Sequence, residues 1–176
     1  MKDNKVDIEP STTVHDLLKA YPELEEKLIS IAPPFKKLKN PFLRKTVAKI
    51  ATIKHISSVG EVPLKELIKK LRMAVGQSQP NIPYEDEEYF YEQPEWYSQN
   101  KVNISVVEDE LENKDEMTLV TILRESKKVK KGEIIELITT FLPAPGIDTM
   151  RSKGYSVWTK KGDDNIIRTY FLKNED

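Results

Sequence analysis

Residues 134–145 read IIELITTFLPAP, an apolar run that stops abruptly at two prolines. An apolar run of this length indicates a strand near the centre of a sheet, and we expect it over Ile134 to Phe141. Pro143 and Pro145 then open a short helix that ends at Gly154, because proline suits the first turn of a helix. This strand, loop and helix predict an α/β fold for the surrounding chain.

The elements on either side complete the pattern. Upstream, residues 102–107 alternate and are β-branched, which predicts a strand, and residues 115–129 have the apolar spacing of a helix. Downstream, residues 155–160 and 165–172 are expected to form a hairpin over residues 162–164. The order βαβαββ predicts a two-layer sandwich, in which two helices cover one face of a mixed four-stranded sheet.

The N-terminal part predicts a small helical bundle instead, so the expected fold class is α plus α/β. Thr13 and Asn40 are the expected N-caps of a first and a third helix, and Pro22 and Pro63 open a second and a fourth. The third helix is expected to run unbroken as far as Gly60. Its apolar arc is expected to hold Phe42, Leu43, Val47, Ile50, Ala51 and Ile53. Its polar arc is expected to hold Arg44, Lys45, Lys49, Thr52 and His55.

Charge divides the chain in a similar way. The sequence has 28 Lys and Arg against 29 Asp and Glu, but residues 80–100 contain only acidic charges. That stretch also holds six of the fourteen aromatic residues, so part of it is expected to lie docked on a surface. The expected parts are a helical domain, an acidic aromatic linker and an α/β domain, over residues 1–76, 77–100 and 101–176.

The composition excludes several kinds of chemistry. The sequence has no cysteine, so it can form no disulfide, thiolate nucleophile or thiolate metal site. His15 and His55 lack the neighbouring ligands of a metal site, and no Gly-rich loop is spaced to cradle a phosphate, so neither a metal nor a cofactor is expected. There is no apolar run of about 18 residues and no signal-peptide core, so we expect a cytoplasmic protein without membrane contact.

Short motifs in the N-terminal part are spaced as in a known family, namely Thr13-Val14, Leu17-Leu18, Tyr21-Pro22-Glu23-Leu24, Gly60, Glu66-Leu67 and Leu71. Over residues 5–76 the chain resembles this bacterial helical family of unknown function. A redox-associated branch of the family has a cysteine pair at the turn where this sequence has Ala32, Pro33 and Pro34. The resemblance therefore implies a helical domain without disulfide chemistry.

The C-terminal part contains DEMTLVTIL at 115–123 and KKGEIIELITTFLPAPGIDTMRSKGY at 130–155, followed by the expected hairpin. Over residues 95–173 it resembles an uncharacterised family whose fold is similar to the sulfur carriers TusA and SirA. Those carriers hold a persulfide on a cysteine where this chain has Lys-Asp-Glu-Met at 114–117, so persulfide transfer cannot occur here. The pairing of two such domains is similar to proteins found near anaerobic, nitric-oxide and iron metabolism, which implies a link to redox metabolism.

One candidate site lies in the basic stretch after Phe35, which contains no acidic residue as far as Ile50. Lysine and arginine contacts to phosphates would give salt-sensitive binding of nucleic acid or another polyanion. The same residues also suit the solvated arc that a surface helix needs, or a dock for the acidic linker of the same or a neighbouring chain. The residues of this candidate polyanion site are Lys36, Lys37, Lys39, Arg44, Lys45 and Lys49.

The favoured candidate site is the loop that leads from the central strand into the following helix. Free N–H groups at a helix N-terminus can bind an anion, although Pro145 removes one of these donors. Around Phe141 and Trp158 we expect an apolar patch that receives a partner. The candidate ligand- or partner-binding residues are Glu116, Phe141, Pro143, Pro145, Asp148 and Trp158.

The favoured function is a non-catalytic binding or adaptor protein for an unidentified protein or small molecule. One alternative is nucleic-acid binding through residues 36–49. Another is an enzyme in which Glu116 and Asp148 share a crevice and act as general acid and base. Carboxylates in the first turn of a helix are also ordinary partners of the helix dipole, so no catalytic residue is assigned.

Overall fold

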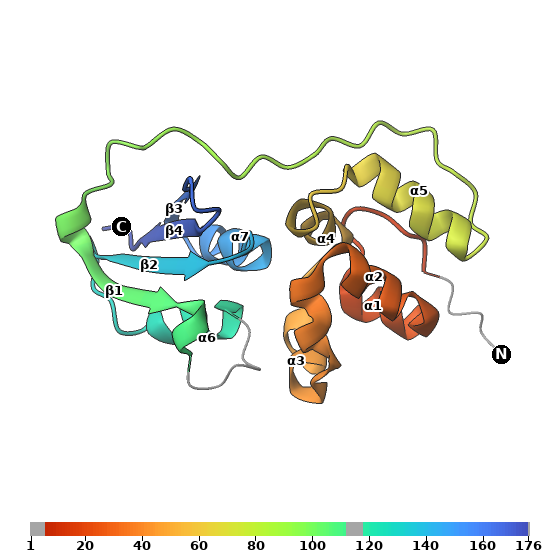
Figure 1. The fold of residues 1–176 in the computed structure, drawn as a ribbon, viewed down its shortest axis with the longest axis horizontal. Helices are drawn as coiled ribbons and strands as arrows, with labels where there is room; N and C mark the ends of the chain where they lie inside the picture. The colour runs from red at the N-terminus through yellow and green to blue at the C-terminus, as the bar shows by residue number, and fades with distance from the viewer. Residues whose placement is uncertain (1–5, 112–117, 176) are drawn as a thin grey trace. The chain divides into compact units, whose positions relative to one another are not determined.

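The computed structural model describes residues 6–111 and 118–175. The chain divides into two compact units, residues 1–87 and residues 88–176, which we call the N-terminal and C-terminal units (Figure 1). The N-terminal unit is helical, and the C-terminal unit holds a mixed four-stranded sheet with helices. At this level the fold class predicted from the sequence is confirmed.

The N-terminal unit contains short helices joined by short connections. Its α-helices are α1 (Val14–Ala20), α2 (Glu25–Ile31), α3 (Pro41–Lys45), α4 (Ile53–Val59) and α5 (Leu64–Ala74). Its 3-10 helices are η1 (Pro22–Leu24), η2 (Pro33–Lys39) and η3 (Val47–Lys49). Two predicted N-caps are confirmed, since the Thr13 side chain accepts from the N–H of Asp16 and the Asn40 side chain from that of Phe42.

The unbroken third helix predicted from Asn40 to Gly60 is wrong. The chain forms α3 and η3 and then starts again as α4, whose N-cap Thr52 forms a capping box with His55. Long-range hydrogen bonds stabilise this break in the helix. The N–H of Ile53 donates to the Thr12 carbonyl at 3.0 Å, and the N–H of Val14 donates to the Ala51 carbonyl at 2.8 Å. An uninterrupted helix would use these groups internally.

Several side chains of this stretch lie where the predicted helix did not place them. His55 is only 6% exposed, and its ring Nδ1 accepts from the Thr52 N–H at 3.1 Å, so it is not a polar-arc residue. Phe42 and Ile50, predicted on the apolar arc, are 64% and 40% exposed. Gly60 ends α4 as predicted, and a Cβ there would lie 2.5 Å from the Ile31 carbonyl oxygen, so only glycine fits.

A buried arginine fastens the ends of the N-terminal unit. Arg72 is 5% exposed; its Nε donates to the Ile8 carbonyl at 2.9 Å and its Nη1 to the Ser78 carbonyl at 2.9 Å. The side chain of Gln77 adds two bonds, accepting from the Ile8 N–H and donating to the Val6 carbonyl. The segments before α1 and after α5 are therefore integral parts of this unit.

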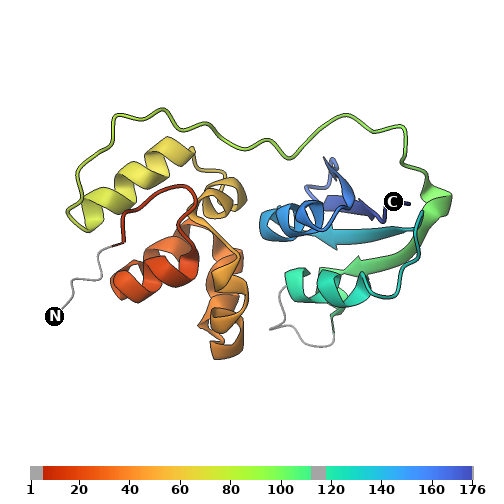
Figure 2. The ribbon, with the colours of Figure 1, turned by 180° about the vertical axis from the view of Figure 1, so that it is seen from behind.

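The C-terminal unit follows the predicted order βαβαββ. Its strands are β1 (Val102–Val107), β2 (Ile134–Thr139), β3 (Ser156–Lys161) and β4 (Ile167–Leu172). Its helices are η4 (Gln99–Lys101), η5 (Glu108–Glu110), α6 (Thr118–Glu125) and α7 (Ala144–Ser152). The strand order is β1-β2-β4-β3; β1 and β2 are parallel, and the other two neighbouring pairs are antiparallel. Helix α7 contacts α6 and β3, and Figure 2 shows both helices beside the sheet.

The predicted docking of the aromatic linker is confirmed for residues 89–97, which pack on the C-terminal unit. Tyr89 is 2% exposed, Phe90 forms a parallel bridge with Thr159, and the ring N–H of Trp158 donates to the Tyr91 carbonyl at 3.0 Å. Trp96 and Tyr97 pack against the buried cluster of Ile134, Trp158 and Tyr170. The preceding residues belong to the N-terminal unit, where Asp86 accepts from the Leu64 N–H at 2.8 Å.

Candidate functional site

A pocket opens where the two parallel strands end. The carboxyl ends of β1 and β2 lie at the same edge of the sheet, and ligands of open α/β sheets bind at such an edge. The pocket has a volume of about 70 Å³ and is open to solvent. We call it the strand-end pocket; its lining residues are Val107, Glu108, Asp109, Ile138, Thr139, Thr140 and Ile166.

The lining of the strand-end pocket combines aliphatic walls with acidic groups. Val107, Ile138 and Ile166 supply the walls, and η5 places Glu108 and Asp109 beside them. A Glu108 carboxylate oxygen lies 3.4 Å from the hydroxyl of Thr140 and 3.5 Å from its N–H, within reach of both donors. Among the residues that the structure describes, the pocket lining includes no lysine, arginine or histidine, so this lining favours a cationic group over an anionic one.

The predicted loop from Phe141 to Pro145 adjoins the strand-end pocket without lining it. Phe141 is half-buried, and its carbonyl accepts from the Thr139 hydroxyl at 2.6 Å. Pro143 and Pro145 are buried. The loop is therefore packed within the C-terminal unit, and the lining of the strand-end pocket ends one residue before it, at Thr140.

Only one member of the predicted carboxylate pair, Asp148, lies among the described residues. Glu116 lies outside them. Asp148, on α7, accepts a hydrogen bond from the Tyr89 hydroxyl at 2.8 Å and lies 3.7 Å from the Arg151 guanidinium. Arg151 in turn lies 5.8 Å from the centre of the Tyr89 ring. Asp148 therefore anchors the docked segment.

Trp158 belongs to an aromatic cluster that we define as Tyr97, Trp158 and Tyr170. The ring centres lie 4.6 to 5.3 Å apart, and Trp158 is only 5% exposed. The ammonium group of Lys160 lies 5.3 to 5.9 Å from all three ring centres, within the range of cation–π attraction. Trp158 is thus a packing anchor for residues 91–97 and does not form the exposed apolar patch that was expected.

Tyr170 is the titratable centre of this cluster. Its hydroxyl donates to a Glu136 carboxylate oxygen at 3.0 Å, and the same carboxylate accepts from Ser105 at 2.7 Å. Burial raises the pKa of Tyr170 well above its ordinary value, and the hydrogen bond with Tyr97 and the charge of Glu136 add to the effect. The phenol is therefore held in its neutral form.

The predicted polyanion site is partly neutralised within the N-terminal unit. Lys39 lies 2.7 Å from a Glu26 carboxylate oxygen, and Arg44 lies 2.5 Å from that of Glu25. The hydrogen bond with Glu26 raises the pKa of Lys39 above its ordinary value. The four exposed lysines of the set are Lys36, Lys39, Lys45 and Lys49, and Lys39 is the one among them that pairs with Glu26. A surface that already contains its own carboxylates is less suited to phosphates than the sequence indicates.

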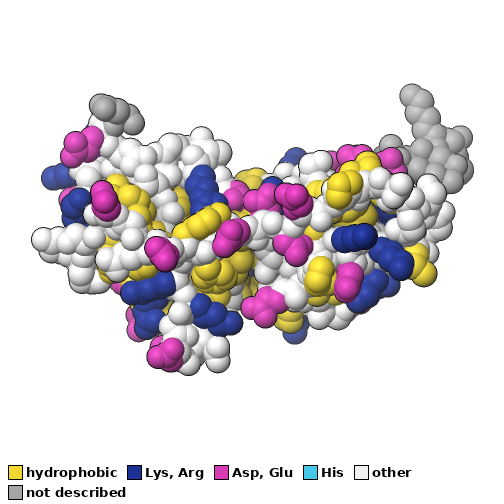
Figure 3. Space-filling view, turned by 90° about the horizontal axis from the view of Figure 1, so that it is seen from above, with side chains coloured by type: hydrophobic (Ala, Val, Ile, Leu, Met, Phe, Trp, Pro, Cys, Tyr) yellow, Lys and Arg dark blue, Asp and Glu magenta, His cyan; other side chains and the backbone are white. Residues whose placement is uncertain are grey.

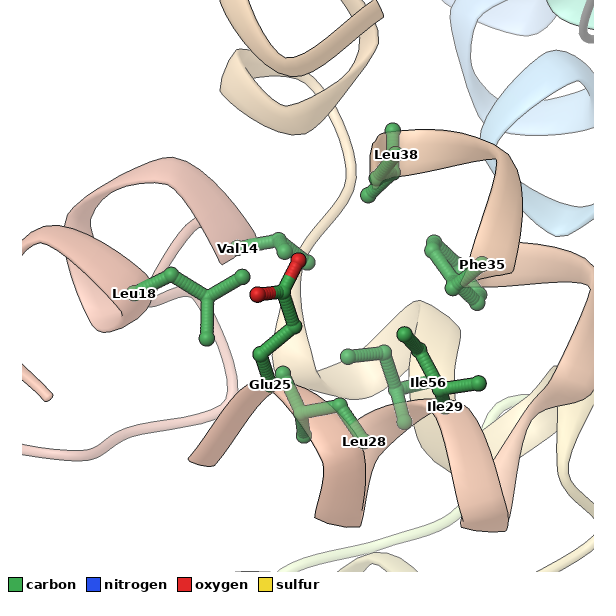
Figure 4. A pocket seen from close by; sticks show the side chains of 8 residues that line it. All are labelled: Val14, Leu18, Glu25, Leu28, Ile29, Phe35, Leu38 and Ile56. Carbon is green, nitrogen blue, oxygen red and sulfur yellow. The ribbon is translucent and has the colours of Figure 1, made fainter. Parts of the chain in front are cut away.

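A second pocket lies inside the N-terminal unit, among apolar side chains of η2 and three α-helices. Its free space is only about 10 Å³, too little for more than a water molecule, and its lining residues are Val14, Leu18, Glu25, Leu28, Ile29, Phe35, Leu38 and Ile56. Figure 4 shows the Glu25 side chain extending among the apolar side chains. Because Glu25 pairs with Arg44, the polar group of this pocket is already used within the fold.

Residues 6–111 and 118–175 hold no group of three or more His, Asp or Glu side chains arranged to bind a metal ion. None of the helices in that part of the chain is long and apolar enough to cross a membrane.

The strand-end pocket was missed by the sequence-based prediction. Its residues come from the ends of two strands and from Ile166, and nothing in their local sequence pattern marks them. The parallel pairing of β1 with β2 was the available signal, because it places both carboxyl ends at one edge.

Comparison with known proteins gives a similarity for part of the chain. Residues 8–68 match the model of a family described as a domain of unknown function (DUF1858). No curated protein and no solved structure matches the chain. The match supports the expectation of an N-terminal domain of unknown function, and the N-terminal region of this chain is similar to that family.

Proposed function

We propose that this protein is a non-catalytic binding module whose C-terminal unit receives an alkylammonium group, such as a lysine side chain of a partner protein, in the strand-end pocket. The observation that carries the proposal is the lining of this pocket, which places Glu108 and Asp109 beside three aliphatic side chains. An adaptor role follows, because a lysine of a partner protein would be recognised without being changed.

The chemistry of the lysine side chain matches the pocket in two ways. Its four methylenes can pack on Val107, Ile138 and Ile166, and each buried methylene contributes about 0.8 kcal/mol. Its ammonium group has three donors and no acceptor, so it suits a lining with two carboxylates. A carboxylate or phosphate ligand would meet like charge there instead.

We further infer the layer arrangement of the two units. In the C-terminal unit, Ile135, Leu137 and Phe171 share one face of the sheet and are fully or almost fully buried, which supports a layer of α6 and α7 over that face. The order βαβαββ supports a TusA-like fold for this unit. In the N-terminal unit, the apolar faces of the five α-helices that the structure describes support a small bundle.

The test is an NMR titration of the full ¹⁵N-labelled chain with n-butylammonium, which is the lysine side chain without its backbone. We expect the amide signals of Val107, Ile138 and Thr140 to shift, with a dissociation constant of about 1 mM or weaker for so small a probe.

Two matched variants make this test specific. Glu108→Gln removes a lining carboxylate and should weaken binding by about tenfold, the size of one charge-assisted hydrogen bond. Glu110→Gln changes an exposed carboxylate of the same short helix that does not line the pocket, and should leave binding unchanged. Equal weakening by both changes, or the absence of any shift at the strand ends, would contradict the proposal.

A further inference from the structure

An exposed surface on the N-terminal unit combines apolar and basic side chains. From α3 through η3 the chain follows an almost continuous helical path, in which the Lys49 N–H donates to the Thr46 carbonyl at 3.2 Å. Residues three, four, seven and eight apart share a side of such a path. We call this side the basic apolar patch; its members are Phe42, Lys45, Lys49 and Ile50.

The side chains of this patch lie at the surface of the N-terminal unit. Phe42 is 64% exposed and Ile50 is 40% exposed, whereas Leu43 and Val47 on the opposite side are buried. Lys45 and Lys49 are exposed and form no ion pair with any residue that the structure describes. An exposed phenylalanine with free cations beside it is typical of a surface that receives a partner.

The chain also carries a surface of the opposite chemistry. Residues 85–95 contain six carboxylates and no lysine or arginine. Tyr89 points into the C-terminal unit, while Phe90 and Tyr91 are 40% and 53% exposed. Their backbone is held by the bridge to Thr159 and by the bond from Trp158. In Figure 3, which looks onto this part of the chain, Asp and Glu side chains lie with hydrophobic side chains among them.

We propose that the basic apolar patch of one copy binds the segment of residues 88–92 of a second copy. Phe90 and Tyr91 would pack against Phe42 and Ile50, which supplies the buried apolar area. Glu88 and Glu92 would face Lys45 and Lys49, which sets the orientation and disfavours other partners. Because the two surfaces differ, the contact is heterologous, so copies associate head to tail or close into a ring.

A second copy fits this patch better than a nucleic acid does. Two of the six cations of the basic stretch, Lys39 and Arg44, are already paired with glutamates of α2. The patch also presents two large apolar side chains, which contribute nothing to phosphate contacts. Residues 88–92 supply carboxylates for the lysines of the patch and exposed aromatic rings for its apolar side chains.

The experiment is sedimentation velocity of the full chain over a wide range of concentrations at low and high salt. Reversible association that weakens with salt is expected. The variant Lys45→Glu with Lys49→Glu should weaken association by at least about tenfold, because like charges then face each other. The control Lys69→Glu with Lys70→Glu reverses two exposed lysines of α5 and should associate like the wild type. Circular dichroism is recorded for each variant to check that it is folded.

A compensating change makes the test decisive. Adding Glu88→Lys and Glu92→Lys to the patch variant restores opposite charges and should restore association. A chain that stays monomeric at every concentration would overturn the proposal, and so would equal weakening by the patch and control variants. Salt-sensitive binding of a labelled single-stranded oligonucleotide that needs Lys45 and Lys49, without self-association, would overturn it in favour of a nucleic-acid site.

Discussion

The two units hold the chain segments that flank their helices and strands by different means. In the N-terminal unit, Arg72 and Gln77 bind the backbone of residues 6–8 through hydrogen bonds of defined direction. In the C-terminal unit, residues 89–97 are held mainly by aromatic side chains that bury area against the sheet. We call the bonds of Arg72 and Gln77 the polar clasp, and the packing of Tyr97, Trp158 and Tyr170 the aromatic dock. The polar clasp fixes the position of a segment, whereas the aromatic dock contributes more to the free energy of unfolding for each side chain.

This difference also explains why residues 88–92 can be held in place and still expose side chains to a partner. Tyr89, Trp96 and Tyr97 supply the packing, so Phe90 and Tyr91 are left exposed without loosening the segment. In the N-terminal unit no such exposed group is left over, because the three guanidinium nitrogens of Arg72 and the amide nitrogen of Gln77 all have partners within the unit.

The largest effect should come from removing the centre of the aromatic dock. Trp158→Ala deletes a buried ring that packs on Tyr97 and Tyr170 and donates to the Tyr91 carbonyl. We expect a loss of about 3 to 5 kcal/mol in the free energy of unfolding. Fluorescence of Trp96 reports it, because Trp96 packs on this cluster. A loss below about 1 kcal/mol would show that the dock is not held by packing.

The polar clasp should contribute less. Arg72→Ala leaves the carbonyls of Ile8 and Ser78 without these donors, which should lower the free energy of unfolding by about 2 to 3 kcal/mol. Chemical denaturation followed by circular dichroism measures it. Arg72→Lys keeps the charge but lacks the planar fork, so it should recover only part of the loss. Full recovery by lysine would mean that charge matters more than hydrogen-bond direction.

A smaller effect is expected at the break between η3 and α4. Thr52→Ala removes the cap that accepts from the His55 N–H and should cost about 1 kcal/mol. Thr46→Ala is the control, because the Thr46 hydroxyl donates to the Phe42 carbonyl and makes no capping hydrogen bond at the start of η3. Thermal unfolding measures the loss of stability for both variants. If the two losses are equal, the capping box does not stabilise the start of α4.

The smallest effect appears only in alkaline solution. Burial raises the pKa of Tyr170, so the folded chain keeps this proton when the unfolded chain releases it near its ordinary pKa of about 10. The contribution of Tyr170 to stability is therefore complete below about pH 10 and declines as the pH rises further. Tyr170→Phe should show a shallower alkaline decline than Tyr84→Phe in denaturant titrations. If the free energy of unfolding falls with pH at the same slope in both variants, the raised pKa of Tyr170 is contradicted.

The features predicted correctly from the sequence are those with local causes. Thr13 and Asn40 cap helices because a side chain bonds to an N–H two or three residues ahead, and the strand after Gly132 is buried because its residues are apolar. The break before Thr52 was not predicted, because it depends on bonds to Thr12 and Val14 some 40 residues away in the chain, and these compete with helix continuation.

The candidate sites were harder to predict for the same reason. The sequence indicates charge along a stretch but not which cations find partners, so the pairing of Arg44 with Glu25 could not be foreseen. The strand-end pocket depends on the turn that brings Ile166 close to Val107 and Ile138. Only the strand-pairing pattern connects these residues, and neither hydrophobic periodicity nor a motif does so.

The measurement that tests the central claim most directly is the preference of the strand-end pocket for the sign of charge. The full chain is titrated with n-butylammonium and, separately, with butyrate, which has the same number of carbon atoms and the opposite charge. We predict that signals from Val107, Ile138 and Ile166 shift with n-butylammonium and not with butyrate, because Glu108 and Asp109 border the pocket. Equal shifts with both probes, or a preference for butyrate, would contradict the proposed binding of an alkylammonium group.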